Sequence, residues 1–310
     1  MIGLSTNLCG VPLRNPIVAA AGTAGYGPEI VEVVPATTFG AITTKSITPE
    51  GRDGNPPWRV TDLPAGMMNA IGLANLGLDR FMNEVMPTLG SIDTVMIGSI
   101  AGHRLEDYRE VATAFADGAA EAIRIVELNV SCPNTATGRQ FGDDPVLLGE
   151  LVQAAVEELG RKPVLVKLSP GSGDPLGLAR VALDAGATGL TLCNTMPAMA
   201  IDPETRKSRI GRASGGLSGP AIHPIAVKIV HDVRAGLRES HPGTQIIGLG
   251  GVLSWRDAAE FVLVGADAVG VGTGLFVDPR TPAKVVQGLG KWVRRQKVDS
   301  IERLVGAWES

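Results

Sequence analysis

Aromatic residues, cysteines and histidines are scarce in this chain, which has 6 Phe, 4 Trp, 2 Tyr, 3 Cys and 4 His among 310 residues. The cysteines lie far apart and form no Cys-x-x-Cys pair, and the histidines show no metal-ligand spacing. The sequence therefore predicts no metal, neither a zinc ion nor an iron–sulfur cluster. Because three dispersed cysteines do not form a disulfide framework, a reducing cytoplasm is the expected location.

Long apolar runs and basic stretches are also missing. No apolar run reaches the roughly 18 residues that a membrane span needs, and the N-terminus lacks the charged region and apolar core of a signal peptide. The net charge is −4, and no basic segment is interleaved with aromatic residues. We therefore expect no membrane and no nucleic acid among the partners.

Glycine, in contrast, is abundant, with 40 residues. Hydrophobic residues make up 44% of the chain and charged residues 19%, which is a globular composition. The glycines follow no collagen period, so we interpret them as residues of turns and of loops that contact ligands.

Short apolar runs rich in β-branched residues alternate with longer amphipathic stretches. The eight runs are Pro16–Ala20, Ala41–Thr44, Thr94–Ile97, Ile125–Val130, Pro163–Leu168, Gly189–Cys193, Gln245–Leu249 and Ala266–Val271. The helical patterns are Leu105–Ala120, Pro145–Leu159, Pro175–Ala185, Pro220–Leu237, Trp255–Val264 and Thr281–Val293, and Asp144 and Asp174 are candidate N-caps. Strand and helix in alternation predict a parallel sheet. We predict an α/β fold, a single (β/α)8 TIM barrel over residues 1–310, with a doubly wound sheet as the alternative.

Two segments of the predicted barrel are longer than a unit needs. A strand–helix unit takes roughly 30 residues, whereas residues 45–98 and 193–249 each carry an insertion after a strand. Both insertions follow the carboxyl end of a strand, which is the catalytic face of such barrels. The segment 4–14 has Gly10 and Pro12 at its turn, and we predict an N-terminal hairpin that closes the opposite end.

A cysteine between two amides follows the fourth predicted strand, in Asn129-Val130-Ser131-Cys132-Pro133-Asn134. An unperturbed thiol has a pKa of about 8.5, so modest help from its surroundings makes it a base or nucleophile at neutral pH. A small buried core residue is the alternative. Asn69, in the first insertion, and Asn194 add further amides, which favour a planar, amide-rich ligand such as a pyrimidine, although each amide could also cap a turn.

Lysines and glycines complete the candidate site. Lys45 and Lys167 end apolar strands, and a buried ammonium needs a partner: an anion, a cofactor ring or a salt bridge. Two glycine clusters, residues 248–251 and 270–274, follow the last two strands. The loops at these positions form the recurring phosphate site of barrels, so we expect the phosphate of a substrate or of FMN there.

The residues resemble a known family, the class 1 dihydroorotate dehydrogenases, which are FMN-dependent (β/α)8 barrels. The resemblance spans roughly residues 4–279, nearly the whole chain. The motifs that carry it are Asn15-Pro16-Ile17, Gly54-Asn55-Pro56 with Arg59, residues 69–73, residues 129–134, residues 166–170, Asn194-Thr195, Gly215-Gly216-Leu217-Ser218-Gly219-Pro220-Ala221-Ile222 and the two glycine clusters.

The resemblance implies a reaction and a set of site residues. Dihydroorotate would be oxidised to orotate in de novo pyrimidine (UMP) biosynthesis, with Cys132 taking the proton from C5 and hydride passing from C6 to FMN. The expected catalytic residues are Cys132 and Lys45. The expected substrate-binding residues are Lys45, Asn69, Ala70, Ile71, Gly72, Leu73, Asn129, Asn134, Asn194 and Thr195. The expected FMN-binding residues are Ala21, Gly22, Lys45, Ser46, Ser99, Asn129, Lys167, Cys193, Gly219, Gly250, Gly251, Gly272 and Thr273, with Lys167 near the N1–C2 edge of the ring.

The resemblance is strongest to class 1B, whose catalytic subunits pass electrons to NAD through a separate FAD and iron–sulfur subunit. It implies a homodimer and a heterotetramer with that subunit. Cys132 separates the chain from class 2, which has Ser there and a membrane-associating extension. The chain departs from the family pattern at three positions: Ser99 stands in place of an Asn, and Trp58 and Leu76 each stand in place of a Pro.

Two other functions fit the same residues. A related flavin enzyme could act on another pyrimidine as a dihydropyrimidine dehydrogenase or reductase, and substrate screening would separate it from an orotate-forming enzyme. A flavin-free barrel that binds phosphate, such as an isomerase or a non-catalytic subunit, would be colourless.

Overall fold

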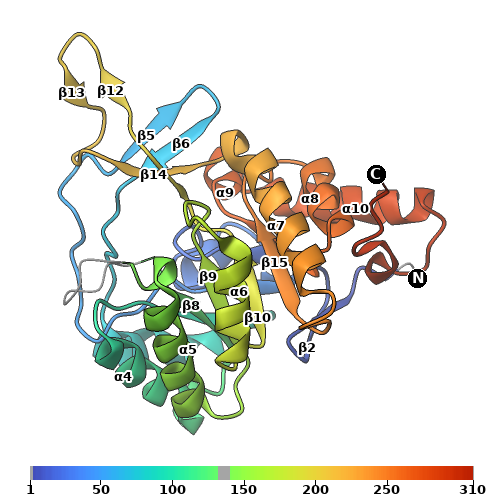
Figure 1. The fold of residues 1–310 in the computed structure, drawn as a ribbon, viewed down its shortest axis with the longest axis horizontal. Coiled ribbons are helices and arrows are strands. Elements are labelled where there is room, and N and C mark those ends of the chain that lie inside the picture. Colours follow the sequence, from blue (N-terminus) through green and yellow to red (C-terminus); the bar gives the residue numbers. More distant parts are fainter. Residues whose placement is uncertain (1–2, 132–139, 310) are drawn as a thin grey trace.

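Eight parallel strands close into a barrel in the computed structural model, which describes residues 3–131 and 140–309. In chain order the barrel strands are β3 (Ile17–Ala19), β4 (Ala41–Thr43), β7 (Val95–Ile100), β8 (Ile123–Asn129), β9 (Val164–Leu168), β10 (Gly189–Leu192), β15 (Gln245–Leu249) and β16 (Ala268–Val271). β16 pairs with β3 and closes the ring (Figure 1). Each strand overlaps one of the eight predicted runs, so the predicted TIM barrel is confirmed.

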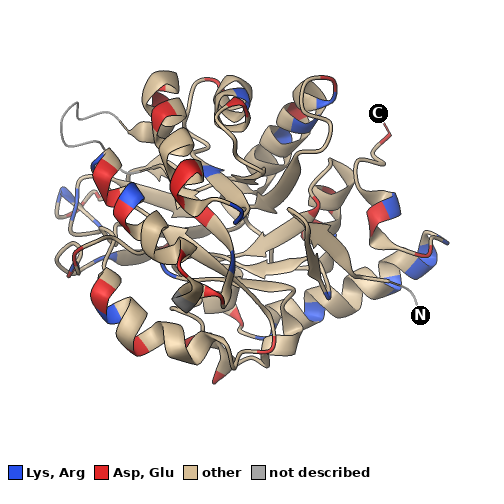
Figure 2. Cartoon of the chain, turned by 90° about the horizontal axis from the view of Figure 1, so that it is seen from below, with Lys and Arg blue, Asp and Glu red and all other residues tan. Residues whose placement is uncertain are grey.

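Helices surround the barrel and follow its strands (Figure 1). The longer ones are α4 (Leu105–Ala116), α5 (Pro145–Leu159), α6 (Pro175–Asp184), α7 (His223–Leu237), α8 (Trp255–Leu263) and α10 (Thr281–Arg295). Shorter pieces are α1 (Pro28–Val31), α2 (Leu78–Arg80), α3 (Met86–Leu89) and α9 (Gly274–Val277). Charged residues lie mostly on these outer helices and loops (Figure 2). None of the helices in the described ranges combines the length and apolarity that crossing a bilayer requires.

Local sequence signals explain where several helices begin. Asp144 accepts hydrogen bonds from the N–H groups of Val146 and Leu147, and Asp174 accepts one from Gly177, so both predicted N-caps are confirmed. The predicted helix 105–120 is shorter than expected, because Asp117 is extended and a 3-10 turn, Gly118–Ala120, follows. The predicted helix 220–237 begins as a 3-10 turn and continues as α7.

An N-terminal hairpin closes the amino end of the barrel, as predicted. β1 (Thr6–Leu8) pairs antiparallel with β2 (Val11–Leu13). The apolar side chains of this hairpin pack against buried apolar residues of the barrel strands. The turn differs from the prediction. Cys9 and Gly10 form it with φ of 52° and 83°, which suits a two-residue hairpin. Pro12 lies in β2, opposite Asn7, not in the turn.

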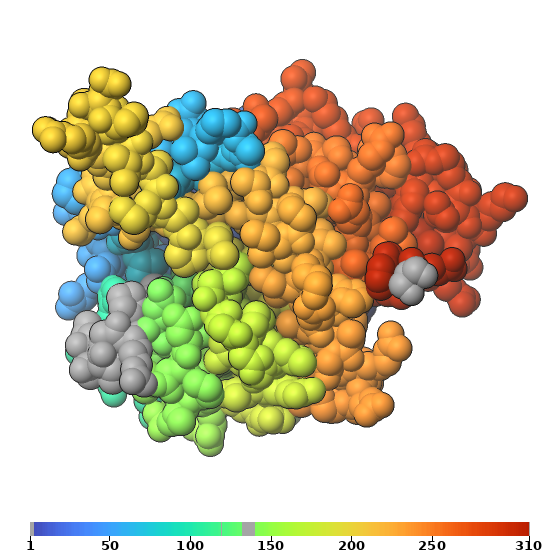
Figure 3. Space-filling view, turned by 45° about the horizontal axis from the view of Figure 1, so that its top comes forward, coloured from blue at the N-terminus to red at the C-terminus, as the bar shows by residue number. Residues whose placement is uncertain are grey.

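The two insertions meet above the carboxyl end of the barrel. β5 (Val60–Leu63) and β6 (Gly66–Asn69) come from the first, and β11 (Met196–Ala198) and β14 (Gly215–Ser218) from the second. They form one antiparallel sheet in the order β11-β14-β6-β5. A small hairpin of β12 (Ile201–Asp202) and β13 (Lys207–Ser208) projects beyond it, next to β5 and β6 (Figures 1 and 3). The insertions therefore form a wall beside the catalytic face.

Candidate active site

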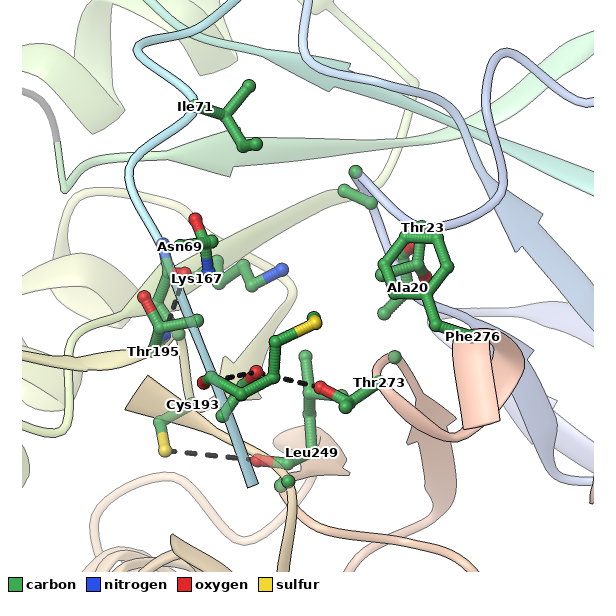
Figure 4. Close-up of a pocket in the computed structure, with 18 of the residues that line it drawn as sticks. Ala20, Thr23, Asn69, Ile71, Lys167, Cys193, Thr195, Leu249, Thr273 and Phe276 are labelled. Atoms are coloured by element: carbon green, nitrogen blue, oxygen red, sulfur yellow. Dashed lines mark hydrogen bonds between the residues drawn. The ribbon is translucent and has the colours of Figure 1, made fainter. Parts of the chain in front are cut away.

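A pocket of about 300 Å³ lies between the carboxyl ends of the barrel strands and the inserted sheet. Figure 4 shows its interior. The Lys167 side chain points into the cavity, with Asn69 and Thr195 on one side and Phe276 on the other. Residues from both insertions and from most of the barrel strands thus surround one ligand-sized space.

Most of the residues expected at the site line this pocket. They are Ala21, Gly22, Lys45, Ser46, Asn69, Ile71, Leu73, Asn129, Lys167, Cys193, Asn194, Thr195, Gly219, Gly250, Gly251, Gly272 and Thr273. Ala70, Gly72 and Ser99 do not line it. Ser99 is fully buried behind Ser46, to which it is hydrogen-bonded at 2.8 Å. Cys132 and Asn134 lie outside the described residues.

The pocket also has lining residues that the sequence reasoning missed. Glu127 lies in the apolar strand β8, two residues before Asn129 and therefore on the same face of the strand. This two-residue spacing from the predicted site residue Asn129 was the available signal that Glu127 also faces the pocket. Phe276 and Val60 come from segments without a motif. The other missed residues are Ala20, Thr23, Met67, Ala74 and Val252, whereas the lining residues Ser218, Ile222, Leu249 and Gly274 belong to the motif 215–222 and the glycine clusters.

A chain of hydrogen bonds fixes the amides along one side of the pocket. Asn194 Nδ2 donates to Asn129 Oδ1 at 3.1 Å and to Ser131 Oγ at 2.9 Å. Asn129 Nδ2 in turn donates to Ser46 Oγ at 3.5 Å. Asn69 belongs to the inserted sheet, where its Nδ2 donates to the carbonyl of Gly216 at 3.3 Å. These amides are held in fixed orientations and can present donors and acceptors to a planar ring.

Electrostatics distinguish the titratable groups of the site. Burial lowers the pKa of the Lys45 ammonium, the charge of Arg59 lowers it further, and Glu29 opposes both. Burial raises the pKa of the Cys193 thiol to about 12, and it does the same for Cys9 at the opposite end of the barrel. Neither of these two thiols is ionised at neutral pH, so neither serves as a base.

The glycine loops provide a place for an anionic group. Gly219, Gly250 and Gly251 have φ of 90°, 153° and 67°, which glycine adopts at little cost. A Cβ on Gly251 would lie 2.7 Å from the carbonyl oxygen of Gly219. Among the turn and loop hydrogen bonds of the described residues, none joins the N–H group of Gly251, Gly272 or Thr273 to a backbone carbonyl. Close backbone approach and free N–H donors fit a phosphate.

The same pocket fits the ring of a flavin. Beside the glycine loops it offers the Lys167 ammonium, a set of amides and apolar side chains such as Leu249 and Phe276. The buried Glu127 Oε1 has no hydrogen-bond partner among the described residues. A cavity at the carboxyl face of a barrel, with convergent polar groups, a cation and glycine loops suited to an anion, is typical of a cofactor-dependent barrel enzyme.

Comparison with known proteins identifies the family. The family model for dihydroorotate dehydrogenase matches residues 3–293. A putative dihydroorotate dehydrogenase A (fumarate) of Solibacter usitatus is 44% identical, over 98% of this chain and 97% of its own. The dihydroorotate dehydrogenase B (NAD(+)) catalytic subunit of Pelobacter propionicus is 40% identical, over 99% and 98%. The chain therefore belongs to the dihydroorotate dehydrogenase family, as the sequence motifs predict.

A solved structure shares the fold. The dihydroorotate dehydrogenase of Eimeria tenella in complex with ferulenol superposes with a TM-score of 0.81, over 99% of this chain and 89% of that one, at 23% identity. Family membership makes the chain an oxidoreductase that uses a flavin. Several relatives are named catalytic subunits, which implies that those proteins work with another subunit.

Proposed function

We propose that the protein oxidises (S)-dihydroorotate to orotate in de novo pyrimidine (UMP) biosynthesis, with FMN as its cofactor. The observation that carries the proposal is that one pocket holds both a fixed set of amides and glycine loops suited to an anion. A dihydropyrimidine ring needs the amides, and a ribityl phosphate needs the free N–H donors.

The residues divide between the cofactor and the substrate. The loops with Gly219, Gly250, Gly251 and Gly272 would hold the phosphate of FMN, while Lys167 lies where a ring edge would rest. Bound FMN supplies an acceptor for the hydride that leaves the substrate. Asn69, Asn129, Asn194 and Thr195 would hold the pyrimidine ring, and Lys45 would pair with the substrate carboxylate.

Cys132 is the proposed base that takes the proton from C5. It follows Ser131, whose hydroxyl accepts a hydrogen bond from Asn194 at the pocket. The two cysteines within the described residues have pKa values of about 12, so they do not compete for this role. Exclusion of water by the bound substrate and the apolar lining would favour proton transfer to the base.

The activity is tested by anaerobic addition of dihydroorotate to the purified protein. Bleaching of the flavin absorbance, with formation of orotate, is the expected result. A yellow protein that dihydroorotate does not reduce, but another dihydropyrimidine does, would move the function to a related pyrimidine enzyme. A colourless, folded protein that binds no FMN would point to a flavin-free phosphate-binding barrel.

The electron acceptor is tested on the reduced protein, by adding fumarate and NAD in turn. We propose an NAD-linked enzyme, a homodimer joined by an FAD and iron–sulfur subunit in a heterotetramer. Relatives of both kinds, named for fumarate and for NAD(+), resemble this chain. If neither acceptor oxidises the isolated chain, the partner subunit is needed. Rapid reoxidation by fumarate alone would contradict the NAD-linked proposal.

Replacing Cys132 tests the proposed base. The Cys132→Ala variant should keep its FMN and lose roughly 100-fold or more of its rate of flavin reduction, because a positioned base contributes at least that much. Stopped-flow reduction by dihydroorotate measures the rate. Cys9→Ala, which removes a thiol at the opposite end of the barrel, is the matched control and should reduce normally. An unchanged rate in Cys132→Ala would remove that residue from the mechanism.

A further inference from the structure

The interior of the barrel changes from apolar to polar along its axis. Near the hairpin it is filled by residues such as Ile97, Ile125, Leu165 and Ile247. Closer to the pocket, buried polar side chains replace them, namely Thr43, Ser99, Glu127, Lys167 and Thr191. Lys167 and Glu127 are the charged members of this layer, and both also line the pocket. An ion pair thus forms part of the pocket floor.

Only one of the two carboxylate oxygens of Glu127 has a hydrogen-bond partner among the described residues. Its Oε2 accepts a hydrogen bond from Thr191 Oγ1 at 2.7 Å. Its Oε1 lies 3.6 Å from Lys167 Nζ and has no hydrogen-bond partner among the described residues. The two side chains are 3% and 7% exposed. The carboxylate therefore balances the charge of the ammonium without a hydrogen bond to it.

This arrangement leaves the ammonium free to donate into the pocket. In Figure 4 the Lys167 side chain points into the cavity, where a cofactor ring would lie. A cation beside a ring stabilises the reduced, more negative form of that ring, and a carboxylate close to the cation offsets the effect. Because the pair is buried, solvent screens neither charge strongly.

We propose that Glu127 is a positioning residue that sets how much of the Lys167 charge reaches the flavin, and thereby its reduction potential. The proposal rests on the flavin assigned under the proposed function, but it does not depend on dihydroorotate being the substrate. Thr191 holds the carboxylate by a hydrogen bond, the carboxylate lies 3.6 Å from the ammonium, and the ammonium points toward the space proposed for the ring.

The test is the flavin reduction potential of Glu127→Gln, measured by anaerobic dithionite titration against a reference dye. The amide keeps the shape of Glu127 and an oxygen that can accept from Thr191, but removes the charge. We expect the equilibrium to shift at least tenfold toward the reduced flavin, which is about 30 mV for a two-electron couple. An unchanged potential would overturn the proposal.

Repeating the Glu127→Gln change in a Lys167→Met variant shows whether Glu127 affects the reduction potential through Lys167. In Lys167→Met the same Glu127→Gln change should shift the equilibrium by less than half as much. An equal shift in both backgrounds would show that Glu127 acts directly on the ring and would overturn its positioning role. Asp267→Asn is the matched control: it breaks the Arg234–Asp267 ion pair at the amino end of β16, away from the pocket, and should leave the potential unchanged.

Unfolding in urea keeps the proposal testable if Glu127→Gln does not fold or the protein holds no flavin. If the two charges are paired, Lys167→Met should lower the urea midpoint by stranding the carboxylate, and Glu127→Gln/Lys167→Met should recover part of the loss. A double variant less stable than Lys167→Met would overturn the pairing. Failure of dihydroorotate to reduce the protein would contradict the proposed function alone, because dithionite still reports the potential.

Discussion

At the scale of single residues, the site separates groups by their surroundings more than by their type. Cys193 and Cys9 are both buried thiols with pKa values raised to about 12, so both stay protonated at neutral pH. Lys45 and Lys167 both line the pocket, yet Lys167 has a buried carboxylate beside it. Lys45 instead has a lowered pKa because of burial and of Arg59. Among the described residues no ion pair or hydrogen bond of the Lys45 ammonium is found, and we expect an anionic ligand to supply its partner.

This state of Lys45 predicts a pH dependence of orotate binding. A bound carboxylate favours the charged ammonium and therefore raises the pKa of Lys45 back toward its usual value. Orotate should bind with uptake of a proton, and its affinity should fall as pH rises through the lowered pKa of free Lys45. Calorimetry in buffers of different ionisation enthalpy measures the uptake. Lys45→Met should bind more weakly and lose this uptake, and a variant that still takes up the proton would assign it to another group.

At the scale of elements, the loops that follow β15 and β16 depend on backbone shape. Gly251 has a φ of 67°, and a Cβ there would meet the carbonyl oxygen of Gly219 at 2.7 Å. A hydrogen bond between His223 Nδ1 and the carbonyl oxygen of Gly250, at 2.8 Å, also holds the loop. These contacts fix the shape of the loop at the proposed phosphate site.

Gly251→Ala should therefore weaken flavin retention. Left-handed backbone costs a non-glycine residue about 1 kcal/mol or more, and the clash with Gly219 forces the loop away from the anion. We expect at least tenfold weaker binding of FMN, measured by flavin fluorescence on dilution. Gly243→Ala, whose Cβ would enter open space, is the control and should keep the cofactor. Normal retention by Gly251→Ala would show that the phosphate binds elsewhere.

At the scale of the whole molecule, the two ends of the barrel are closed by different structures. The hairpin of β1 and β2 seals the amino end with apolar side chains, whereas the inserted sheet walls the pocket at the carboxyl end. The apolar seal and the candidate active site therefore lie at opposite ends of the barrel, which is the usual division in these barrels.

This division predicts that damage to the hairpin lowers stability without changing the site. Leu13 is 2% exposed among the barrel residues, so Leu13→Ala should lower the free energy of unfolding by about 2–5 kcal/mol. The folded fraction should keep its flavin spectrum and its rate of reduction. Val33→Ala, at a residue that is 63% exposed, should change stability by less than about 0.5 kcal/mol. A lower rate of flavin reduction in folded Leu13→Ala would show that the hairpin end of the barrel affects the active site, which contradicts this prediction.

The sequence by itself determined the order and the approximate positions of the barrel elements. Apolar runs and helical periods are local patterns, so they located all eight strands, and Asp144 with Pro145 marked the start of α5 at the residue where it begins. The motifs also selected a family that the comparisons confirm. Most of the residues expected from that resemblance do surround one pocket.

Only the tertiary structure decided how distant segments meet. Asn69 and Gly216 are opposite each other in one sheet, although 147 residues separate them. No local pattern records that pairing, because only the closed barrel places the two insertions side by side. Glu127 likewise reads as part of an apolar strand in the sequence. Its role depends on Lys167 and Thr191, which reach it from the next two strands of the barrel.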